Sequence, residues 1–207
     1  MDKNYYLLFF SLFWTPICQG QLLLQKNYFD EQNQKIKSII SVSIKDSTLE
    51  GPYLAYYPNG HKKIEGFYQQ NHADSLWTYY HDNGYEKAVG YFLNNEQFGL
   101  WRYYDKSGIK QREVTFKNGL KSGVYKDYYI EEKIKSSGGL LNGKKTGLWK
   151  EYNQDGVVKN TKLIQNDTTL FKCYFYSNGN INEQGTKINK KRSGKWTVFF
   201  KNGQVAN

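Results

Sequence analysis

Side chains that could act as acids, bases, nucleophiles or metal ligands are few in this chain and widely spaced. The three histidines, His61, His72 and His81, fall beside or within turn-like segments, and no two of them share a spacing typical of metal ligands. No Ser or Cys nucleophile sits in a recognisable catalytic motif. We therefore expect solvated turn histidines, no metal, no cofactor and no enzymatic activity.

Three glutamates are spaced more regularly than the histidines. If the chain folds into repeated hairpins, Glu65, Glu86 and Glu113 come near the same part of successive return strands. A row of carboxylates could bind a cation, but salt pairing with neighbouring lysines is the interpretation that we favour. A sheet of this kind also offers no concave pocket for a small-molecule substrate.

The most regular spacing belongs to aromatic residues, which could stack on one another or on a ligand. They recur about every 24 residues in two sets. The first set comprises Tyr53, Trp77, Trp101, Tyr125, Trp149, Cys173 in place of an aromatic residue, and Trp196. The second set comprises Tyr56, Tyr80, Tyr104, Tyr128, Tyr152, Tyr176 and Phe199. A fixed period of this length is typical of a repeat array.

Turn residues keep the same period and define the elements that carry the aromatic rows. One turn set comprises Asn59-Gly60, Asn83-Gly84, Ser107-Gly108, Glu131-Glu132, Asp155-Gly156, Asn178-Gly179 and Asn202-Gly203. A second set comprises Gln70, Asn94, Asn118, Asn142, Asn166 and Asn189. Asn-Gly pairs between strand-like segments predict β-hairpins with type I′ turns, in which both central residues have positive φ.

The hairpin register follows from counting outward from the first set of turns. It places Trp77 opposite Gly90, and the corresponding pairs are Tyr53–Gly66 and Tyr125–Gly138. The other two readable repeats pair Trp101 with Val114 and Trp149 with Lys162. An aromatic ring beside a strand glycine is a known stabilising arrangement. A further row on the return strands comprises Tyr68, Phe92, Phe116, Leu140 and Ile164.

The predicted fold is all-β: an elongated, single-layer antiparallel sheet of tandem hairpins of about 24 residues. In a sheet without a second layer, the aromatic rows take the place of a core, and this is the interpretation that we favour. The alternative is a platform on which carbohydrate rings stack.

The pattern G-x-W-x-x-Y-x-x-N-G followed by G-x-Y/F-x-N-G resembles the MORN repeat, in particular the bacterial variant of the YwqK-family antitoxins. The clearest copies are residues 98–104 and 144–152, and the resemblance covers about residues 50–207. It implies extended, single-layer hairpins. The departures are Ser75 in a Gly position, Cys173 in a Trp position and one residue lost in the copy at 168–191. Residues 26–49 form a candidate degraded copy, with Phe29 in the Trp position and Asn33-Gln34 as the turn.

The first 20 residues have the pattern of a secretory signal peptide. The eleven residues from Leu7 to Ile17 form a mainly apolar segment that is too short to span a bilayer, and cleavage before Gln21 is expected. This predicts an exported protein, periplasmic or extracellular, with an N-terminal segment at 21–49 and the array at 50–207. The alternatives are an uncleaved anchor, an N-terminal strand, or membrane attachment through a lipid on Cys18. Cleavage would leave Cys173 as a single cysteine, expected to act as a small hydrophobic residue.

The chain has a net charge of +10, spread through every repeat. Short clusters give candidate basic contacts at Lys144, Lys145, Lys190, Lys191 and Arg192. The charge could hold the chain near anionic lipid or glycan, or it could prevent the sheet from associating with other copies, which we favour. Nucleic acid is not an expected partner of an exported chain.

We therefore expect a non-enzymatic, exported repeat scaffold that binds a protein partner. The alternative is an envelope-surface protein that binds anionic lipid or glycan. A third possibility, suggested by the resemblance alone, is a protein that neutralises a toxin by covering it.

Overall fold

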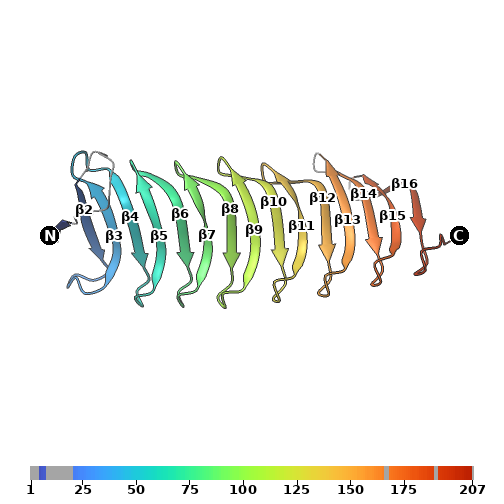
Figure 1. Cartoon of the computed structure of the whole chain (residues 1–207), viewed down its shortest axis with the longest axis horizontal. Coiled ribbons are helices and arrows are strands. Elements are labelled where there is room, and N and C mark those ends of the chain that lie inside the picture. Colours follow the sequence, from blue (N-terminus) through green and yellow to red (C-terminus); the bar gives the residue numbers. More distant parts are fainter. Residues whose placement is uncertain (1–4, 8–20, 166–167, 189–190, 207) are drawn as a thin grey trace, which may run out of the picture. The chain divides into compact units, whose positions relative to one another are not determined.

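The computed structural model describes residues 5–7, 21–165, 168–188 and 191–206, and within them it is all-β. The sixteen strands follow one another through the sheet in chain order, and every strand pair with a defined register is antiparallel (Figure 1). This confirms the predicted fold class of tandem hairpins in one open sheet. No helix long and apolar enough to cross a membrane occurs in the described part of the chain.

The strands are regular in length. Their bounds are β1 Tyr5–Leu7, β2 Leu22–Tyr28, β3 Ile36–Ser43, β4 Leu49–Tyr56, β5 Lys62–Gln69, β6 His72–Tyr80, β7 Glu86–Leu93, β8 Glu96–Tyr104, β9 Lys110–Lys117, β10 Leu120–Tyr128, β11 Ile134–Leu141, β12 Lys144–Tyr152, β13 Val158–Gln165, β14 Thr168–Phe175, β15 Ile181–Ile188 and β16 Lys191–Val198. The chain divides into two compact units, which we describe separately. Unit 1 comprises residues 1–98 and 104–108, and unit 2 comprises residues 99–103 and 109–207.

The turns within the hairpins differ from the prediction. In the hairpin of β4 and β5, the Tyr57 N–H donates to the His61 carbonyl and the Gly60 N–H donates to the Tyr57 carbonyl, which encloses a loop of three residues. Gly60 has a φ of +88°, whereas Asn59 is not among the residues with positive φ. These are type I turns followed by a residue in the left-handed region, and not type I′ turns.

The predicted strand register is nevertheless correct. Trp77 pairs with Gly90, Tyr53 with Gly66, Tyr125 with Gly138 and Trp149 with Lys162. The loop has one residue more than predicted, and a bulge then adds one residue to the return strand. In the hairpin of β6 and β7, this shift lies between the Tyr79–Ala88 and Tyr80–Glu86 pairs. The longer loop and the bulge shift the strand register in opposite directions, so the residue pairs beyond the bulge are those predicted.

Type I′ turns occur instead in the second turn set, which joins one hairpin to the next. Asn94 and Asn95 both have positive φ, at 50° and 69°, and so do Asn142 and Gly143. Each such turn is hydrogen-bonded to the preceding repeat: the Asn95 N–H donates to the Ala73 carbonyl, and the Asn95 side chain accepts from the Ala73 N–H at 2.6 Å. Asn166 and Asn189, predicted for the same set, lie outside the described residues.

The Gly of each G-x-W segment forms a second kind of bulge, where a hairpin meets the preceding one. Between the Glu65–Thr78 and Phe67–Asp74 pairs, three residues of β6 lie opposite the single residue Gly66. The residue two positions before the tryptophan takes positive φ, as in Gly99 and Gly147. Ser75 occupies the same position with a φ of 62°.

Replacing Ser75 by Gly is expected to raise the free energy of unfolding by about 0.5 kcal/mol. The left-handed region costs a residue with a Cβ about 1–2 kcal/mol, and part of that gain is offset by the greater entropy of Gly in the unfolded chain. Urea unfolding of the two proteins measures the difference. The matched change Ser122→Gly, at a strand position without positive φ, is expected to lower stability. A lower stability of the Ser75→Gly variant would contradict this account of the bulge.

The tryptophans pack between hairpins and not only within them. An ideal Cβ built on Gly66 would lie 2.2 Å from Cδ2 of Trp77, and one on Gly138 would lie 2.3 Å from Cδ2 of Trp149. Each ring therefore covers the glycine of the preceding return strand. We call this side of the sheet the Trp face. Its buried apolar residues include Trp77, Trp101, Val114, Phe116, Leu140, Trp149 and Ile164.

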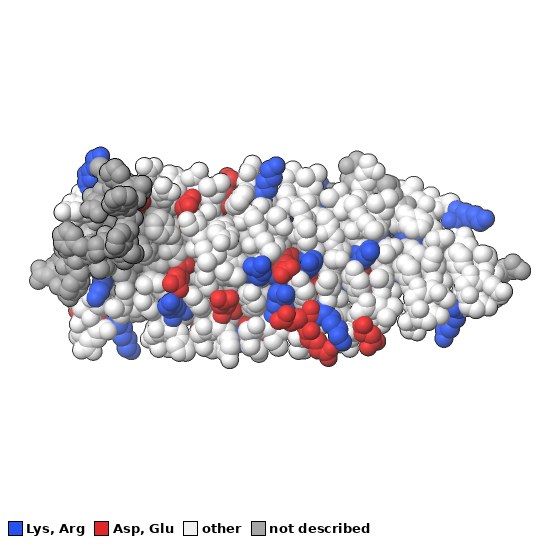
Figure 2. All heavy atoms as spheres, viewed as in Figure 1, with Lys and Arg blue, Asp and Glu red and all other residues white. Residues whose placement is uncertain are grey.

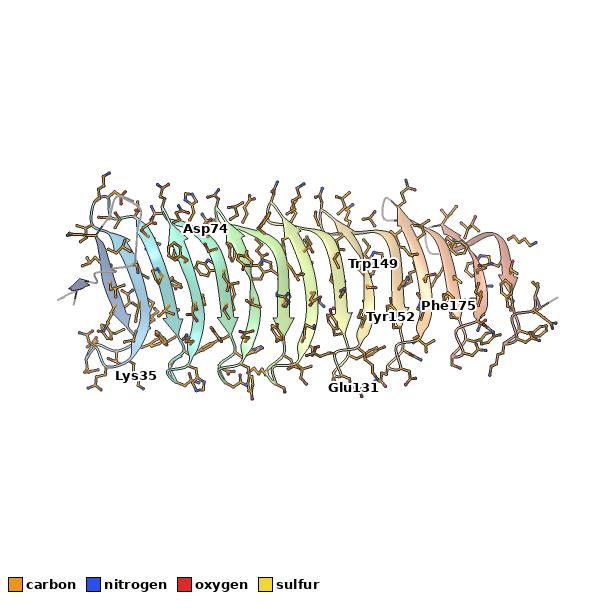
Figure 3. The ribbon with its side chains drawn as sticks, viewed as in Figure 1. Lys35, Asp74, Glu131, Trp149, Tyr152 and Phe175 are labelled. Carbon is orange, nitrogen blue, oxygen red and sulfur yellow. The ribbon has the colours of Figure 1, made fainter. Side chains whose placement is uncertain are left out.

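Two positions of the repeat alignment are corrected by the strand register. Lys172 pairs with Gly185, as Trp77 pairs with Gly90, so Lys172 and not Cys173 occupies the Trp position. Phe175 takes the second aromatic position instead of Tyr176, and it lies near the same turn-bearing edge as Tyr152 (Figure 3). The copy at 168–191 is one residue shorter than the others because of the bulge at the start of β14. This bulge contains one residue more than the facing strand, whereas the bulge of β12 contains two more.

The N-terminal segment contains a real hairpin with a different alignment from the predicted one. Strands β2 and β3 pair, and Asn33 in their loop has positive φ. Phe29 lies at the loop, 41% exposed, while Gln25 takes the place that Tyr53 has in the next hairpin. Tyr5–Leu7 pairs with β2. Residues 8–20, with most of the predicted signal peptide and Cys18, lie outside the described residues.

Candidate functional site

The two sides of the sheet have different chemistry because neighbouring residues of a strand point to opposite sides. On the Trp face three tryptophan rings leave almost no exposed surface: Trp77 is 4%, Trp101 1% and Trp149 3% exposed. The indole N–H groups of Trp77 and Trp149 are also used, since Trp77 Nε1 donates to the Asp74 carbonyl and Trp149 Nε1 donates to the Gly139 carbonyl, both at 3.0 Å. Buried rings with satisfied N–H groups act as a core and cannot serve as a stacking platform.

The opposite side, which we call the leucine face, carries exposed apolar side chains. In unit 2, Leu148 pairs with Leu163, and Leu163 pairs with Phe171, so the three side chains are cross-strand neighbours. Their exposed fractions are 52%, 41% and 38%. In unit 1, Leu76 pairs with Tyr91, and Phe67 and Leu76 line a shallow hollow of about 530 Å³.

The tyrosines of the second aromatic set lie on the leucine face, near the turns. Tyr80 donates its hydroxyl to Glu65 at 3.0 Å, and Tyr128 donates to Glu113 at 2.7 Å. Burial raises the pKa of Tyr128, and the hydrogen bond to Glu113 raises it further. These hydroxyls therefore stay protonated and bind one strand to another, which is a structural role.

Two of the three predicted glutamates, Glu65 and Glu113, form ion pairs. Glu86 lies nearer the turn, opposite Tyr80, so the three do not form a row. Glu65 pairs with Lys62, and Glu113 lies within 4.0 Å of Lys110, Lys126 and Arg102. Figure 2 shows acidic and basic side chains interspersed on the visible side. Among the described residues, no group of three or more His, Cys, Asp or Glu side chains is placed to hold a metal ion.

Two of the three histidines, His61 and His81, link one repeat to the next, whereas His72 Nδ1 lies 2.7 Å from the Gln70 carbonyl of its own turn. His61 Nδ1 lies 2.8 Å from the Asp82 carbonyl, and His81 Nε2 lies 3.1 Å from the Tyr104 carbonyl. Three tyrosines make the same kind of link: Tyr57 donates to the Tyr80 carbonyl, Tyr129 to the Tyr152 carbonyl and Tyr176 to the Phe199 carbonyl. The sequence indicated turn histidines, but these links between residues about 23 positions apart were not expected.

The predicted basic residues do not form one patch. Lys145 lies over the Trp149 ring, with Nζ 3.9 Å from the centroid. Arg192 is paired with Glu183 and lies 4.3 Å from the Trp196 ring centroid. Lys144 and Lys191 are the first residues of β12 and β16, and Lys190 lies outside the described residues.

A lysine-rich pocket of about 280 Å³ opens on the Trp face of unit 2. Its lining residues are Lys145, Trp149, Glu151, Lys162, Ile164, Lys172 and Lys187. Figure 3 shows Trp149 on β12, in the body of the strand. The sequence pattern singled out only Lys145 of the four lysines. A signal for two of the other lysines was present in the repeat pattern. Lys172 stands where other repeats have a tryptophan, and Lys162 stands where other repeats have a glycine.

Comparison with known proteins supports the repeat type at two places. The family model described as "MORN repeat variant" matches residues 49–70 and 99–118, which are the hairpins of β4–β5 and β8–β9. No curated protein is significantly similar to this chain in sequence.

Solved structures with local similarity include a single-residue mutant of TarM from S. aureus in complex with fondaparinux, alpha-GlcNAc-glycerol and UDP, at 17% identity and a TM-score of 0.34. The alignment covers 45% of this chain and 19% of TarM. The TcdB2-TccC3-Cdc42 structure is aligned over 91% of this chain and 11% of its own, at 11% identity and a TM-score of 0.28. Neither structure informs the fold or the function at these TM-scores. The sequence match identifies residues 49–70 and 99–118 as repeats of the MORN variant type.

Proposed function

We propose that this chain is a non-enzymatic, exported repeat scaffold that binds a protein partner through its leucine face. The observation that carries the proposal is the row of exposed, adjacent apolar side chains formed by Leu148, Leu163 and Phe171. Contiguous exposed apolar patches on soluble proteins often mark interaction sites. A second set with the same character, Leu76 and Tyr91, occupies the corresponding face of unit 1.

The geometry favours a protein partner over a stacked carbohydrate. Stacking on the Trp face needs exposed ring faces, and Trp77, Trp101 and Trp149 are buried. The leucine face offers branched aliphatic side chains on a hydrogen-bonded sheet, so little conformational entropy would be lost when a partner packs against them. A toxin neutralised by coverage would be one such partner, because coverage requires only a complementary apolar surface.

The variant Leu148→Ser/Leu163→Ser tests this role. We expect it to weaken the affinity for the partner at least tenfold, because it removes two neighbouring apolar side chains from the contact. The partner is first trapped with a photo-crosslinking residue at position 148 and identified, and affinity is then measured by calorimetry. Ile130→Ser is the matched control, since Ile130 is 74% exposed but lies in a turn. Unchanged affinity of the double variant for the trapped partner would refute the proposal.

Export is a separate part of the proposal, supported by the apolar segment of residues 7–17. Mass spectrometry of the protein recovered from its native compartment would test it. A mature N-terminus at Gln21 supports export by cleavage, and a lipid on Cys18 would indicate membrane attachment. An intact Met1 in a cytoplasmic fraction would refute it.

The second candidate function is binding of anionic lipid or glycan at an envelope surface. The observation that favours it is the lysine-rich pocket on the Trp face, because its lysines converge on one site while the remaining charge is dispersed. Both functions could belong to one protein, since the pocket and the leucine face lie on opposite sides of the sheet.

A further inference from the structure

We propose that the lysine-rich pocket of unit 2 binds a phosphate monoester or pyrophosphate group. The lining residues come from four consecutive strands, β12 to β15, so the pocket belongs to a continuous part of one unit. This site is distinct from the leucine face and does not depend on the protein-binding role proposed above.

The pocket exists because the repeat pattern is broken at two adjacent positions. Lys172 occupies the place of a tryptophan, and Lys162 occupies the place that Gly66, Gly138 and Gly185 have in other repeats. Elsewhere a tryptophan ring covers this glycine and fills the space, as Trp149 covers Gly138. Here Lys172 takes the place of that tryptophan, with its Nζ 4.2 Å from the Tyr174 ring centroid, and a pocket remains beside Trp149.

The two substituted lysines lie directly opposite each other. Lys162 and Lys172 are cross-strand partners, and like charges in such pairs destabilise a sheet. Unfavourable interactions that persist in a folded protein tend to occur at functional sites. An anion bound between the two ammonium groups would turn this repulsion into attraction.

Two further lysines surround the same space. Nζ of Lys145 lies over the Trp149 ring, and Nζ of Lys187 lies 5.8 Å from the Trp196 ring centroid. Burial lowers the pKa of Lys145, and the charge of Lys162 lowers it further, as expected for an ammonium group held among other cations. The contacts of the ammonium groups with the rings help to hold both lysines at the pocket that they line.

One carboxylate is present in the pocket, and both of its oxygens are used. Glu151 Oε1 accepts from Lys162 at 2.5 Å, and Oε2 accepts from Asn160 at 2.7 Å. Among the carboxylates of the described residues, none forms an ion pair with Lys145, Lys172 or Lys187. Four ammonium groups and one carboxylate leave an excess of three positive charges around about 280 Å³.

This excess of positive charge in the pocket favours an anion that carries more than one negative charge. A phosphate monoester carries a charge of about −1.5 to −2 at pH 7 and three strong acceptor oxygens, which several ammonium groups can share. A single carboxylate provides less charge and fewer acceptors. The volume lies near the lower limit for small-molecule pockets, so it suits a phosphate group with a small attached part and not a large ligand buried whole.

Calorimetric titration of the full-length protein with sodium pyrophosphate in low salt tests the site. We expect saturable 1:1 binding that weakens as salt rises, because screening reduces the attraction. Lys172→Gln and Lys145→Gln should each weaken binding at least tenfold. Lys201→Gln, an exposed turn lysine of the same unit, should change it less than twofold.

Folding and binding defects can be told apart in the same variants. Lys172→Gln removes a like-charge pair, so its urea midpoint should equal or exceed that of the original protein. Absence of pyrophosphate binding at millimolar concentration, or equal weakening by Lys201→Gln, would overturn the proposal for a soluble ligand.

Vesicles distinguish a lipid headgroup from a free phosphate compound. Phosphatidic acid carries a phosphate monoester, whereas phosphatidylglycerol carries a diester of lower charge. Binding to phosphatidic acid vesicles that is lost in Lys172→Gln would assign the group to a lipid. Binding of pyrophosphate without vesicle binding would assign it to a soluble compound. Vesicle binding that is unaffected by Lys172→Gln, without pyrophosphate binding, would show diffuse surface attraction and refute the pocket.

Discussion

Replacing Trp101 by Ala is expected to lower the free energy of unfolding by about 3–5 kcal/mol, the range for truncating a large buried aromatic residue. Trp101 is 1% exposed and packs edge-to-face on Phe116, with ring centroids 6.1 Å apart. Val114, on the same strand as Phe116, is fully buried. The variant would leave a cavity in the part of the Trp face where apolar burial is greatest.

Trp196→Ala is the control for this prediction, because Trp196 is only half-buried and lies on β16, the last strand. It should lose less stability, as expected where a repeat has a neighbour on one side only. Urea unfolding followed by far-UV circular dichroism measures both variants. Equal losses for Trp101→Ala and Trp196→Ala would show that the Trp face is not the core of the array.

Replacing Gly66 by Ala is expected to destabilise unit 1 by about 3 kcal/mol, at the upper end of the cost of overpacking. The added Cβ would lie 2.2 Å from the Trp77 ring, and the ring cannot move without losing its hydrogen bond from Nε1 to the Asp74 carbonyl. Gly66 has no positive φ, so the cost would come from the ring contact and not from backbone strain.

A double-mutant cycle isolates this contact. In the Trp77→Ala background, Gly66→Ala should cost less than about 1 kcal/mol, because the clashing ring is gone. Gly99→Ala is the contrasting control: no atom would lie within 4 Å of a Cβ added to Gly99, but its φ is +66°, so the change should cost about 1–2 kcal/mol in either background. An equal cost of Gly66→Ala with and without Trp77 would contradict packing of the ring on the glycine.

The fold could be predicted from the sequence because the turn residues and the aromatic residues repeat together. The pairs Trp77–Gly90 and Tyr125–Gly138 were correct even though the turn type was wrong. A three-residue loop and a one-residue bulge together shift the register as a two-residue loop alone would. Counting residues outward from a turn can therefore give the correct strand pairs without identifying which turn residues have positive φ.

The repeat alignment was wrong in β14, because positions were counted forward from the preceding repeat across a bulge that is one residue shorter there. Cys173 was assigned to the Trp position from the preceding repeats, but hydrogen bonds of the Tyr176–Asn180 turn fix the register of β14. Counting back from that turn gives Lys172. The site was missed because of this error, since the facing lysines Lys162 and Lys172 are visible only in the correct register.

The partner of each tryptophan could not be predicted from hairpin register alone. Each tryptophan strand has two neighbouring strands, and the residue pattern allows a glycine beneath the ring in either of them. The bulge at the Gly of the G-x-W segment turns the ring toward the preceding hairpin, where Trp77 covers Gly66. That choice depends on the local backbone path, for which the residue pattern holds no direct signal.

The bulge at the start of each repeat also determines where the array can change in length. In β14 the bulge is one residue shorter than in the other repeats, yet the strand pairs on both sides of it remain in step. Because turn chemistry fixes the register at the opposite end of the hairpin, a deletion in the bulge is confined to a few residues. An insertion within a strand would instead reverse the side to which every following side chain points. Single-residue deletions and insertions should therefore accumulate at these bulges in related arrays, while the strands change only by substitution.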